Sequence, residues 1–328
     1  MATYKRQRYL LMATDPVHIG TGGYRLGRVD NSIVREPGTR LPKIPGTSLH
    51  GAARSYAAQI YGTPGAAGQN QDKIENPDNN PVCYTFGYIK KTNRNTGDET
   101  MAFSGVINIF DAHVLLFPVH SMAGPVWVGT KNRLAEAGFT VNGVFPAGDT
   151  AAALSTWERK DALNLGWLMV NLAGKATVAA PPKWQDGARW QAVQDRIILV
   201  PESLFSQLVN SNLEVHTSVA IDPERGAAKE GALFTYEALP RTTFLTMEVV
   251  LDDYRCTGER WPLGEIKETG QKKPFPPKVS WSGPLDVVKS GLGMIEWLGV
   301  GGMGTRGFGR LAMAGGPLEQ AYGEEAWK

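Results

Sequence analysis

Strand-like and helix-like patterns follow one another along this chain in an order that few folds accommodate. Six segments carry a clear signal, and in chain order they are strand 4–14, helix 49–61, strand 104–118, strand 242–251, helix 284–298 and strand 311–313. This order predicts an α+β fold in which helices cover one face of an antiparallel sheet. The ferredoxin-like arrangement is the small fold that matches it.

Three further stretches interrupt that order. Strand-like runs over 213–219 and 231–236 flank a turn at 222–226 and predict a β-hairpin with a long polar tip. Such a hairpin usually packs on its own domain, and the alternative is an arm that reaches a neighbour or wedges into nucleic acid. The polar stretch 63–102 and the Ala- and Trp-rich, partly helical stretch 138–190 are predicted to be insertions.

The start of the first helix has a capping signal. Pro45 and Gly46 precede Thr47 and Ser48, so Thr47 or Ser48 is the predicted N-cap, and Gly62 is the predicted end. Free N–H groups at a helix start also favour an anion, although capping alone explains the pattern.

Charge is distributed unevenly along the 328 residues. The net charge is only +2, but the first sixty residues hold nine Lys or Arg and three acids, so they carry +6 and the remainder −4. A basic face on a near-neutral chain fits a phosphate-backbone partner. A hydrophobic content of 42% excludes wholesale disorder.

The cysteine count and the hydropathy indicate the compartment. Cys83 and Cys256 form neither a disulfide framework nor a four-cysteine zinc site, and free thiols fit a reducing cytoplasm. No apolar run reaches the length of a membrane span and no signal peptide is apparent, so we expect a cytoplasmic protein without a membrane partner.

Two loops carry candidate chemistry. Segment 299–309 has six glycines in eleven residues, and such a loop either rings an anion with its N–H groups or simply turns. It lacks the P-loop signature, and it precedes a strand, whereas a dinucleotide-binding loop follows one. His18 and Asp30 bracket the first glycine-rich loop. A lone His or Asp is more often structural, but a loop carboxylate among arginines also suits a divalent ion beside a phosphate.

Together these segments resemble one CRISPR family. The quoted stretches are Pro16–Gly22, Gly27–Glu36, Leu41–Gly51, Ser104–Ile107, Phe110–Val119, Gly231–Phe234 and Gly301–Arg310. In this order they resemble the backbone subunit of type III-B (Cmr) effectors, a member of the RAMP superfamily. Leu116–Val119 favours type III-B over the related type III-A subunit.

The resemblance implies an RRM-like palm with an insertion domain and a thumb. The palm is then 1–62, 103–137, 191–212 and 237–328, the insertions are 63–102 and 138–190, and the thumb hairpin is 213–236. It also implies crRNA, target single-stranded RNA and other Cmr subunits as partners, and self-association into a filament. In this family each thumb displaces a nucleotide pair, and an acidic residue supports metal-dependent cleavage of the target at regular intervals.

Mapped onto this chain, the catalytic and metal-binding carboxylate is Asp30, with a transient Mg²⁺ or Mn²⁺ ion. The expected RNA-binding residues are His18, Arg28, Lys43, Thr47, Ser48, His50, Arg54, Gly301, Gly302, Thr305, Arg306 and Gly307. The expected thumb residues are His216, Thr217, Val219, Ile221 and Phe234. The family usually has lysine where His50 stands, so a weaker phosphate contact is expected there.

Three functions stay open at this point. The first is a backbone subunit that cleaves, and the second is one that binds RNA without cutting; a type III-A counterpart is a variant of either. The third is an unrelated nucleotide-using enzyme, which the position of the glycine-rich loop before a strand disfavours.

Overall fold

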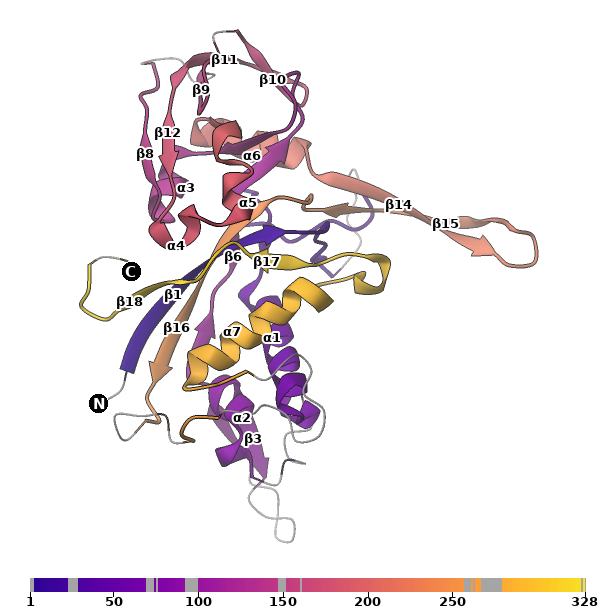
Figure 1. Ribbon diagram of the computed structural model, residues 1–328. Coiled ribbons are helices and arrows are strands. Elements are labelled where there is room, and N and C mark those ends of the chain that lie inside the picture. Colours follow the sequence, from indigo (N-terminus) through magenta and orange to yellow (C-terminus); the bar gives the residue numbers. More distant parts are fainter. Residues whose placement is uncertain are drawn as a thin grey trace.

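The computed structural model describes residues 3–22, 29–68, 74, 76–91, 100–146, 152–159, 161–256, 261, 263–266, 279–325 and 327. Its centre is a four-stranded antiparallel sheet in the order β6 (Ala112–Val119), β16 (Phe244–Asp253), β1 (Thr3–Ala13) and β17 (Leu311–Met313). Helix α1 (Gly46–Tyr61) lies between β1 and β6 in the chain, and α7 (Pro284–Leu298) lies between β16 and β17. This is the ferredoxin-like order, so the predicted fold class is confirmed (Figure 1).

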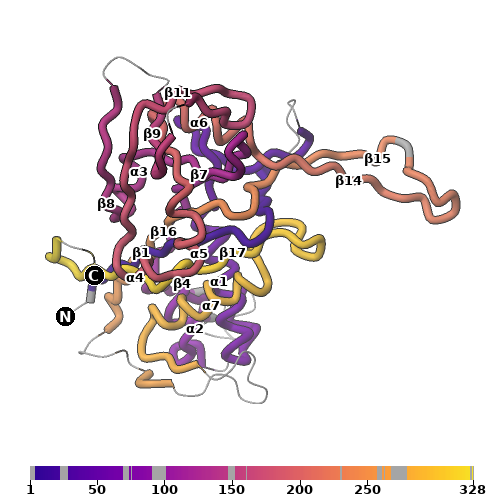
Figure 2. The backbone as a smooth tube through the Cα atoms, turned by 45° about the horizontal axis from the view of Figure 1, so that its top comes forward, coloured from indigo at the N-terminus to yellow at the C-terminus, as the bar shows by residue number. Residues whose placement is uncertain are grey.

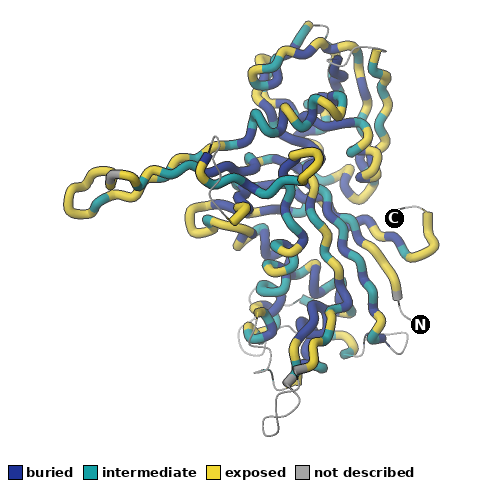
Figure 3. The backbone as a smooth tube through the Cα atoms, turned by 180° about the vertical axis from the view of Figure 1, so that it is seen from behind, coloured by how far each residue is buried: buried dark blue, intermediate teal, exposed yellow. Residues whose placement is uncertain are grey.

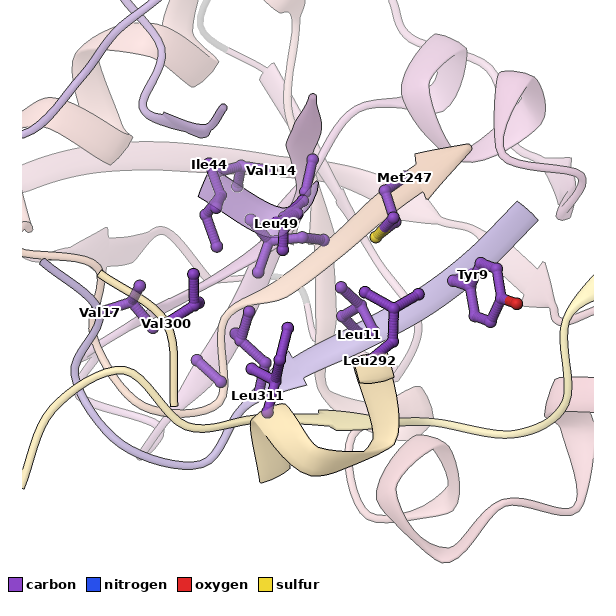
Figure 4. Packing of buried hydrophobic residues seen from close by; sticks show 14 of the residues in the cluster. Tyr9, Leu11, Val17, Ile44, Leu49, Val114, Met247, Leu292, Val300 and Leu311 are labelled. Carbon is purple, nitrogen blue, oxygen red and sulfur yellow. The ribbon is translucent and has the colours of Figure 1, made fainter. Parts of the chain in front are cut away.

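Side chains alternate along each strand, so both faces of the sheet contribute residues to a core. Tyr9 and Leu11 of β1 belong to the core that also holds Leu49 of α1 and Leu292 of α7 (Figure 4). Leu10, between them, points to the opposite face of the sheet. There it belongs to a second core that also holds Trp184 and Trp190. Each core residue on β1 is almost fully buried.

Short strands lengthen this sheet at its margins. The predicted strand over 104–118 is divided into β5 (Ile107–Ile109) and β6, of which β5 pairs with β16. Strand β2 (Lys43–Ile44) pairs with β6, and β18 (Leu318–Ala321) pairs with β1. The sequence patterns did not indicate β18.

The segment after β6 continues the sheet outward (Figure 2). The strands follow in the order β7 (Val126–Gly129), β13 (Ile197–Leu199), β9 (Ala152–Ser155), β11 (Leu168–Lys175) and β10 (Leu163–Leu165). A separate pair is β8 (Thr140–Asn142) with β12 (Thr177–Ala179). The helices here are α3 (Lys131–Glu136), α4 (Pro182–Gln185), α5 (Ala188–Gln191) and α6 (Glu202–Ser211). The described part of the stretch 138–190 thus holds short strands as well as the two short helices α4 and α5, so it is partly helical as predicted, and its strands were not predicted.

The stretch 63–102 contributes to the main core despite its polar composition. Helix α2 (Pro81–Phe86) is capped by the Asn80 side chain, which accepts from the N–H groups of Val82 and Cys83. Strands β3 (Gly87–Lys91) and β4 (Thr100–Ser104) form a hairpin after it. All six α2 residues are buried. Cys83 and Cys256 are both buried and are not joined by a disulfide.

The remaining elements are an arm and short turns. The predicted hairpin is formed by β14 (Glu214–Asp222) and β15 (Ala227–Ala238), which project from the body as an arm with a mainly exposed tip (Figure 3). Single 3₁₀ turns are Pro64–Ala66, Pro77–Asn79, Gln194–Arg196 and Gly304–Arg306. Among the described residues no helix is both long and apolar enough to cross a bilayer.

The close crossing of α7 over α1 gives a test of the fold. A Cβ on Gly291 would lie 2.2 Å from the Ala53 carbonyl oxygen of α1. We expect Gly291→Ala to lower the free energy of unfolding by about 1–3 kcal/mol because backbone must move. The matched control is Gly293→Ala on the same helix, whose Cβ would meet only the Met313 methyl at 3.9 Å. It should be neutral or stabilising by up to about 1 kcal/mol. Urea unfolding of both variants checks this, and equal losses would contradict it.

Candidate nucleic-acid interface

Three segments that are far apart in the sequence meet at the base of the arm. Residues 29–35 run beside β15, with a parallel bridge between Asn31 and Tyr236. The Asn31 amide donates to the Thr235 carbonyl at 3.0 Å, and the Glu237 amide donates to the Asn31 carbonyl at 3.0 Å. The glycine-rich loop packs against His18 and Ile19 in the segment that follows β1. The structure thus brings the first loop, the hairpin base and the C-terminal loop together.

Asp30 is exposed and is bound to the arm. Its Oδ2 accepts the Thr235 backbone N–H at 2.7 Å and the Thr235 hydroxyl at 3.0 Å, while its own amide donates to the same hydroxyl oxygen at 3.1 Å. These bonds, the backbone N–H first, lower the pKa of the Asp30 carboxyl from its usual value. Asp30 is therefore a fixed carboxylate at neutral pH. Arg28, expected nearby, lies outside the described residues.

An ion pair also anchors the same loop. The Arg35 guanidinium meets the Glu237 carboxylate at 2.8 Å, and both side chains are mostly buried. The Ile33 amide also donates to that carboxylate, at 3.3 Å. Arg35 reaches α6 through the Asn210 side-chain oxygen, at 2.8 Å. The loop is thus tied to the arm and to the neighbouring helix.

His18 is part of the packing beneath this site. The residue is 6% exposed, and its Nδ1 lies 2.6 Å from the Glu237 carbonyl oxygen. The ring also meets the Tyr236 ring edge-on at 5.8 Å. These contacts are those of the structural histidine, and an RNA contact of His18 stays a prediction.

The glycine-rich loop is shaped by close backbone packing. Gly301 has φ +89°, and a Cβ there would lie 2.6 Å from the His18 carbonyl oxygen. The Gly302 amide donates to that carbonyl at 2.9 Å. Only glycine fits at position 301, and the Gly302 amide serves the fold. At the outer turn, Thr305 and Arg306 are exposed, and Gly307 closes the turn with φ +83°. Arg306 is therefore the residue of this loop that is best placed for a phosphate.

The two faces of the arm differ in chemistry. His216 and Phe234 lie on the inner face, where His216 stacks on Tyr236 at 5.5 Å and meets Phe308 of the C-terminal loop at 4.9 Å. The outer face carries the cross-strand pairs Thr217 with Thr235 and Val219 with Leu233. Val219 is 40% and Leu233 65% exposed. Beyond a register shift, Ile221 is also exposed. An apolar outer face therefore begins next to Asp30.

The prediction of an N-cap at Thr47 or Ser48 was wrong. Helix α1 begins at Gly46 after Pro45, and no side chain of those two residues caps it. Instead the Gly46 amide donates, at 2.7 Å, to the carboxylate of Asp111, the residue just before β6. The carboxylate of Asp111 thus occupies the helix start, where free N–H groups would otherwise favour an external anion.

Other predicted RNA contacts at this helix have internal partners. Hydrogen bonds from Lys43 to Asp111 and Glu36 raise the pKa of Lys43. Burial, and then the Arg54 charge, lower the pKa of His50, so this ring is neutral at pH 7. Arg54 donates to the carbonyls of Ala66 and Gly87, both at 2.8 Å. Contacts of Lys43, His50 and Arg54 with RNA stay predictions, as do those of the more accessible Thr47 and Ser48.

The metal expectation rests on one carboxylate. No cluster of three or more His, Cys, Asp or Glu suits a metal ion in the described part of the chain. Mg²⁺ in phosphoryl-transfer sites often takes one or two carboxylates and fills its shell with water and substrate phosphates. An ionised, exposed Asp30 fits a transient ion of that kind.

Comparison with known proteins identifies the family. The RAMP superfamily model matches residues 10–312. The chain belongs to the RAMP superfamily. Within this superfamily it is 26% identical over 249 residues to the CRISPR system Cmr endoribonuclease Cmr4 of Pyrococcus furiosus, covering 71% of this chain and 77% of the relative. A shorter match, 45% identical over 62 residues, is to the Csm3 endoribonuclease of Enterococcus italicus and covers 18% of this chain and 29% of the relative.

Solved structures share the fold. A chain in the cryo-EM structure of type III-B Cmr-beta in its apo state superimposes with a TM-score of 0.57 at 14% identity, covering 97% of this chain and 98% of that one. The crystal structure of oligomeric Cmr4 from Pyrococcus furiosus gives 0.53 at 18% identity, covering 99% and 100%. The predicted resemblance to the type III-B backbone subunit is confirmed.

Sequence reasoning missed the partners that hold the site. Thr235, Glu237 and Arg35 gave no local signal, because their roles arise from the side-by-side packing of segments about 200 residues apart. The role of Asp111 at the start of α1 was not predicted either, because this carboxylate lies inside a strand-like run of the sequence.

The Arg35–Glu237 pair gives a test of this packing. We expect Glu237→Ala to lower the free energy of unfolding by about 3–5 kcal/mol, because it leaves a mostly buried guanidinium without its carboxylate. The matched control is Glu158→Ala, which removes an exposed carboxylate 3.8 Å from Lys175 and should cost less than about 1 kcal/mol. Chemical denaturation of the two variants provides the measurement, and a Glu237 variant as stable as its control would refute the anchor.

Proposed function

We propose that this chain is a crRNA-binding backbone subunit that cleaves guide-paired target RNA, with Asp30 as the catalytic carboxylate. The proposal is supported by membership of the RAMP superfamily and by similarity to a relative named as a Cmr endoribonuclease. The single observation that carries it is the position of Asp30. An ionised, exposed carboxylate is fixed at the base of an exposed arm, beside an apolar outer face.

The arm suits the task of a wedge. Apolar side chains that enter between base steps unstack them, and Val219 and Leu233 are a directly opposed, exposed pair of this type. A nucleotide displaced in this way can place its 2′-hydroxyl in line with the adjacent phosphate. The base sequence is read by guide pairing, so the protein needs to contact shape and backbone only, as in RNA-guided DNA effectors.

Asp30 would hold a divalent ion, Mg²⁺ or Mn²⁺, together with oxygens of the RNA. Such an ion stabilises charge that develops on the phosphate during cleavage. Thr235 orients the carboxylate by occupying Oδ2 with two donors.

Repeated copies would explain cleavage at regular intervals. A structural relative is described as oligomeric Cmr4, and another comes from type III-B Cmr-beta bound to cognate target RNA, with a TM-score of 0.56 and 13% identity. We propose that copies of this chain line up along a crRNA with other Cmr subunits.

The purified protein is expected to carry RNA of one or a few discrete lengths. Purification of the protein as a monomer without RNA would refute the proposed assembly.

The central experiment replaces Asp30. In the assembled complex with guide-matched labelled RNA, Asp30→Ala should reduce cleavage by at least about 100-fold, because ion binding is lost, while RNA affinity changes little. The control is Asp186→Ala, which removes an exposed carboxylate at the end of α4. Each protein is assayed with Mg²⁺, with Mn²⁺ and with EDTA. Unchanged cleavage by the Asp30 variant would exclude Asp30, and full cleavage in EDTA would exclude the ion.

Arg306 should act on binding instead of chemistry. Arg306→Ala removes one exposed cation of the C-terminal loop, so the affinity for crRNA should fall and the slope of log K against log salt should become shallower by about 0.7–0.9. Lys289→Ala removes an exposed charge from α7 and controls for net charge. A salt titration of binding compares them. Identical slopes for the two variants would show that Arg306 contacts no phosphate.

A further inference from the structure

Asp30 and Thr235 hold each other through both backbone and side chain. The Thr235 hydroxyl donates to Asp30 Oδ2 and accepts from the Asp30 amide, and the Thr235 amide donates to the same Oδ2. Within the described part of the chain, no other residue hydrogen-bonds the Asp30 carboxylate. Two donors that converge on one oxygen fix the side-chain torsions and leave the other oxygen for further contacts.

The same threonine belongs to the arm. Thr235 lies two residues from Leu233 on β15, on the same outer face, since Thr217 and Val219 are their direct cross-strand partners. The two Cα atoms are thus separated by roughly 7 Å along one rigid strand. The carboxylate and the exposed apolar pair are therefore parts of one structural unit.

We infer that Thr235 is a positioning residue. It holds the Asp30 carboxylate in a fixed position relative to the arm, so that the cut falls at the phosphate beside the displaced nucleotide. This inference rests on the proposed function. Thr235 acts through Asp30 and needs no contact with the RNA. Placement matters because a shift of about 1 Å in a reacting group can cost 100-fold in rate.

The loop has other anchors that do not use the hydroxyl. Backbone hydrogen bonds of Asn31 with Thr235 and Glu237 remain when the Thr235 side chain changes, and so does the Arg35–Glu237 pair. Valine has nearly the shape of threonine and suits a strand. Thr235→Val should therefore fold with the loop docked, while the Asp30 side chain loses one of its two donors and the Asp30 amide its acceptor.

The experiment measures single-turnover cleavage in the assembled complex with guide, Mg²⁺ and labelled target. Thr235→Val should lower the rate at saturating target by about 10- to 100-fold, with target affinity within about twofold of wild type. Thr235→Ser keeps the hydroxyl and should recover most of the rate. The control Thr177→Val removes a hydroxyl that accepts from Asn142 on an exposed strand of the outer segment, and should cleave normally.

The outcomes separate this inference from the proposed function. An inactive Asp30→Ala variant with a fully active Thr235→Val variant would overturn the positioning role alone, whereas a fully active Asp30→Ala variant would overturn the proposed catalytic role. A Thr235→Val loss that Thr235→Ser does not recover would also refute positioning by the hydroxyl. Thr235→Ala removes the same group and gives the same test if the valine variant does not fold. Mapping the cut ends adds a second readout, because displaced or scattered cuts are expected only when the carboxylate is loose.

Discussion

The pairing of β1 with β16 determines where every other part of the site lies. Ten consecutive residue pairs join the two strands, from Thr3 with Asp253 to Met12 with Phe244. Because side chains alternate, a slip of one residue would exchange the two cores, so the register is strongly fixed. At one end of this pair, Ala13 hydrogen-bonds Thr243 and Thr242. The chain that leaves β1 and the chain that enters β16 must then run side by side.

That shared end explains the convergence of the three loops. The segment after β1 contains Asp30, the segment before β16 contains the arm, and β17 begins opposite Ala13 with the glycine-rich loop before it. The Thr14 amide also donates to the Arg310 carbonyl oxygen, which ties the end of the glycine-rich loop to the residue after β1. The site is therefore a consequence of topology. Three loops meet at the same end of the central strands β1, β16 and β17, and binding residues are commonly placed on such loops.

The sequence predicted the elements better than their contacts. Helix 284–298 has the predicted bounds, and the strand at the N-terminus and the hairpin are present. These elements have local periodicity or turn residues, which one segment alone reveals. The partner of the α1 start and the hydrogen bonds that hold Asp30 were not predictable locally, since Asp111 and Thr235 lie far from them in the sequence. The candidate carboxylate was identified through family resemblance, and its role stays a proposal.

The net charge of a segment likewise does not reveal which of its cations are free to bind a phosphate. The first sixty residues carry an excess of +6, yet much of it is neutralised inside the protein. Arg8 pairs with Glu248, Arg35 with Glu237, and Lys43 with two carboxylates. A paired guanidinium attracts a phosphate less than a free one, and exchanging partners costs the original ion pair. Affinity for an RNA backbone would then come from unpaired, exposed groups such as Arg306, and the inner ion pairs would instead keep the carboxylate and the arm in one fixed geometry.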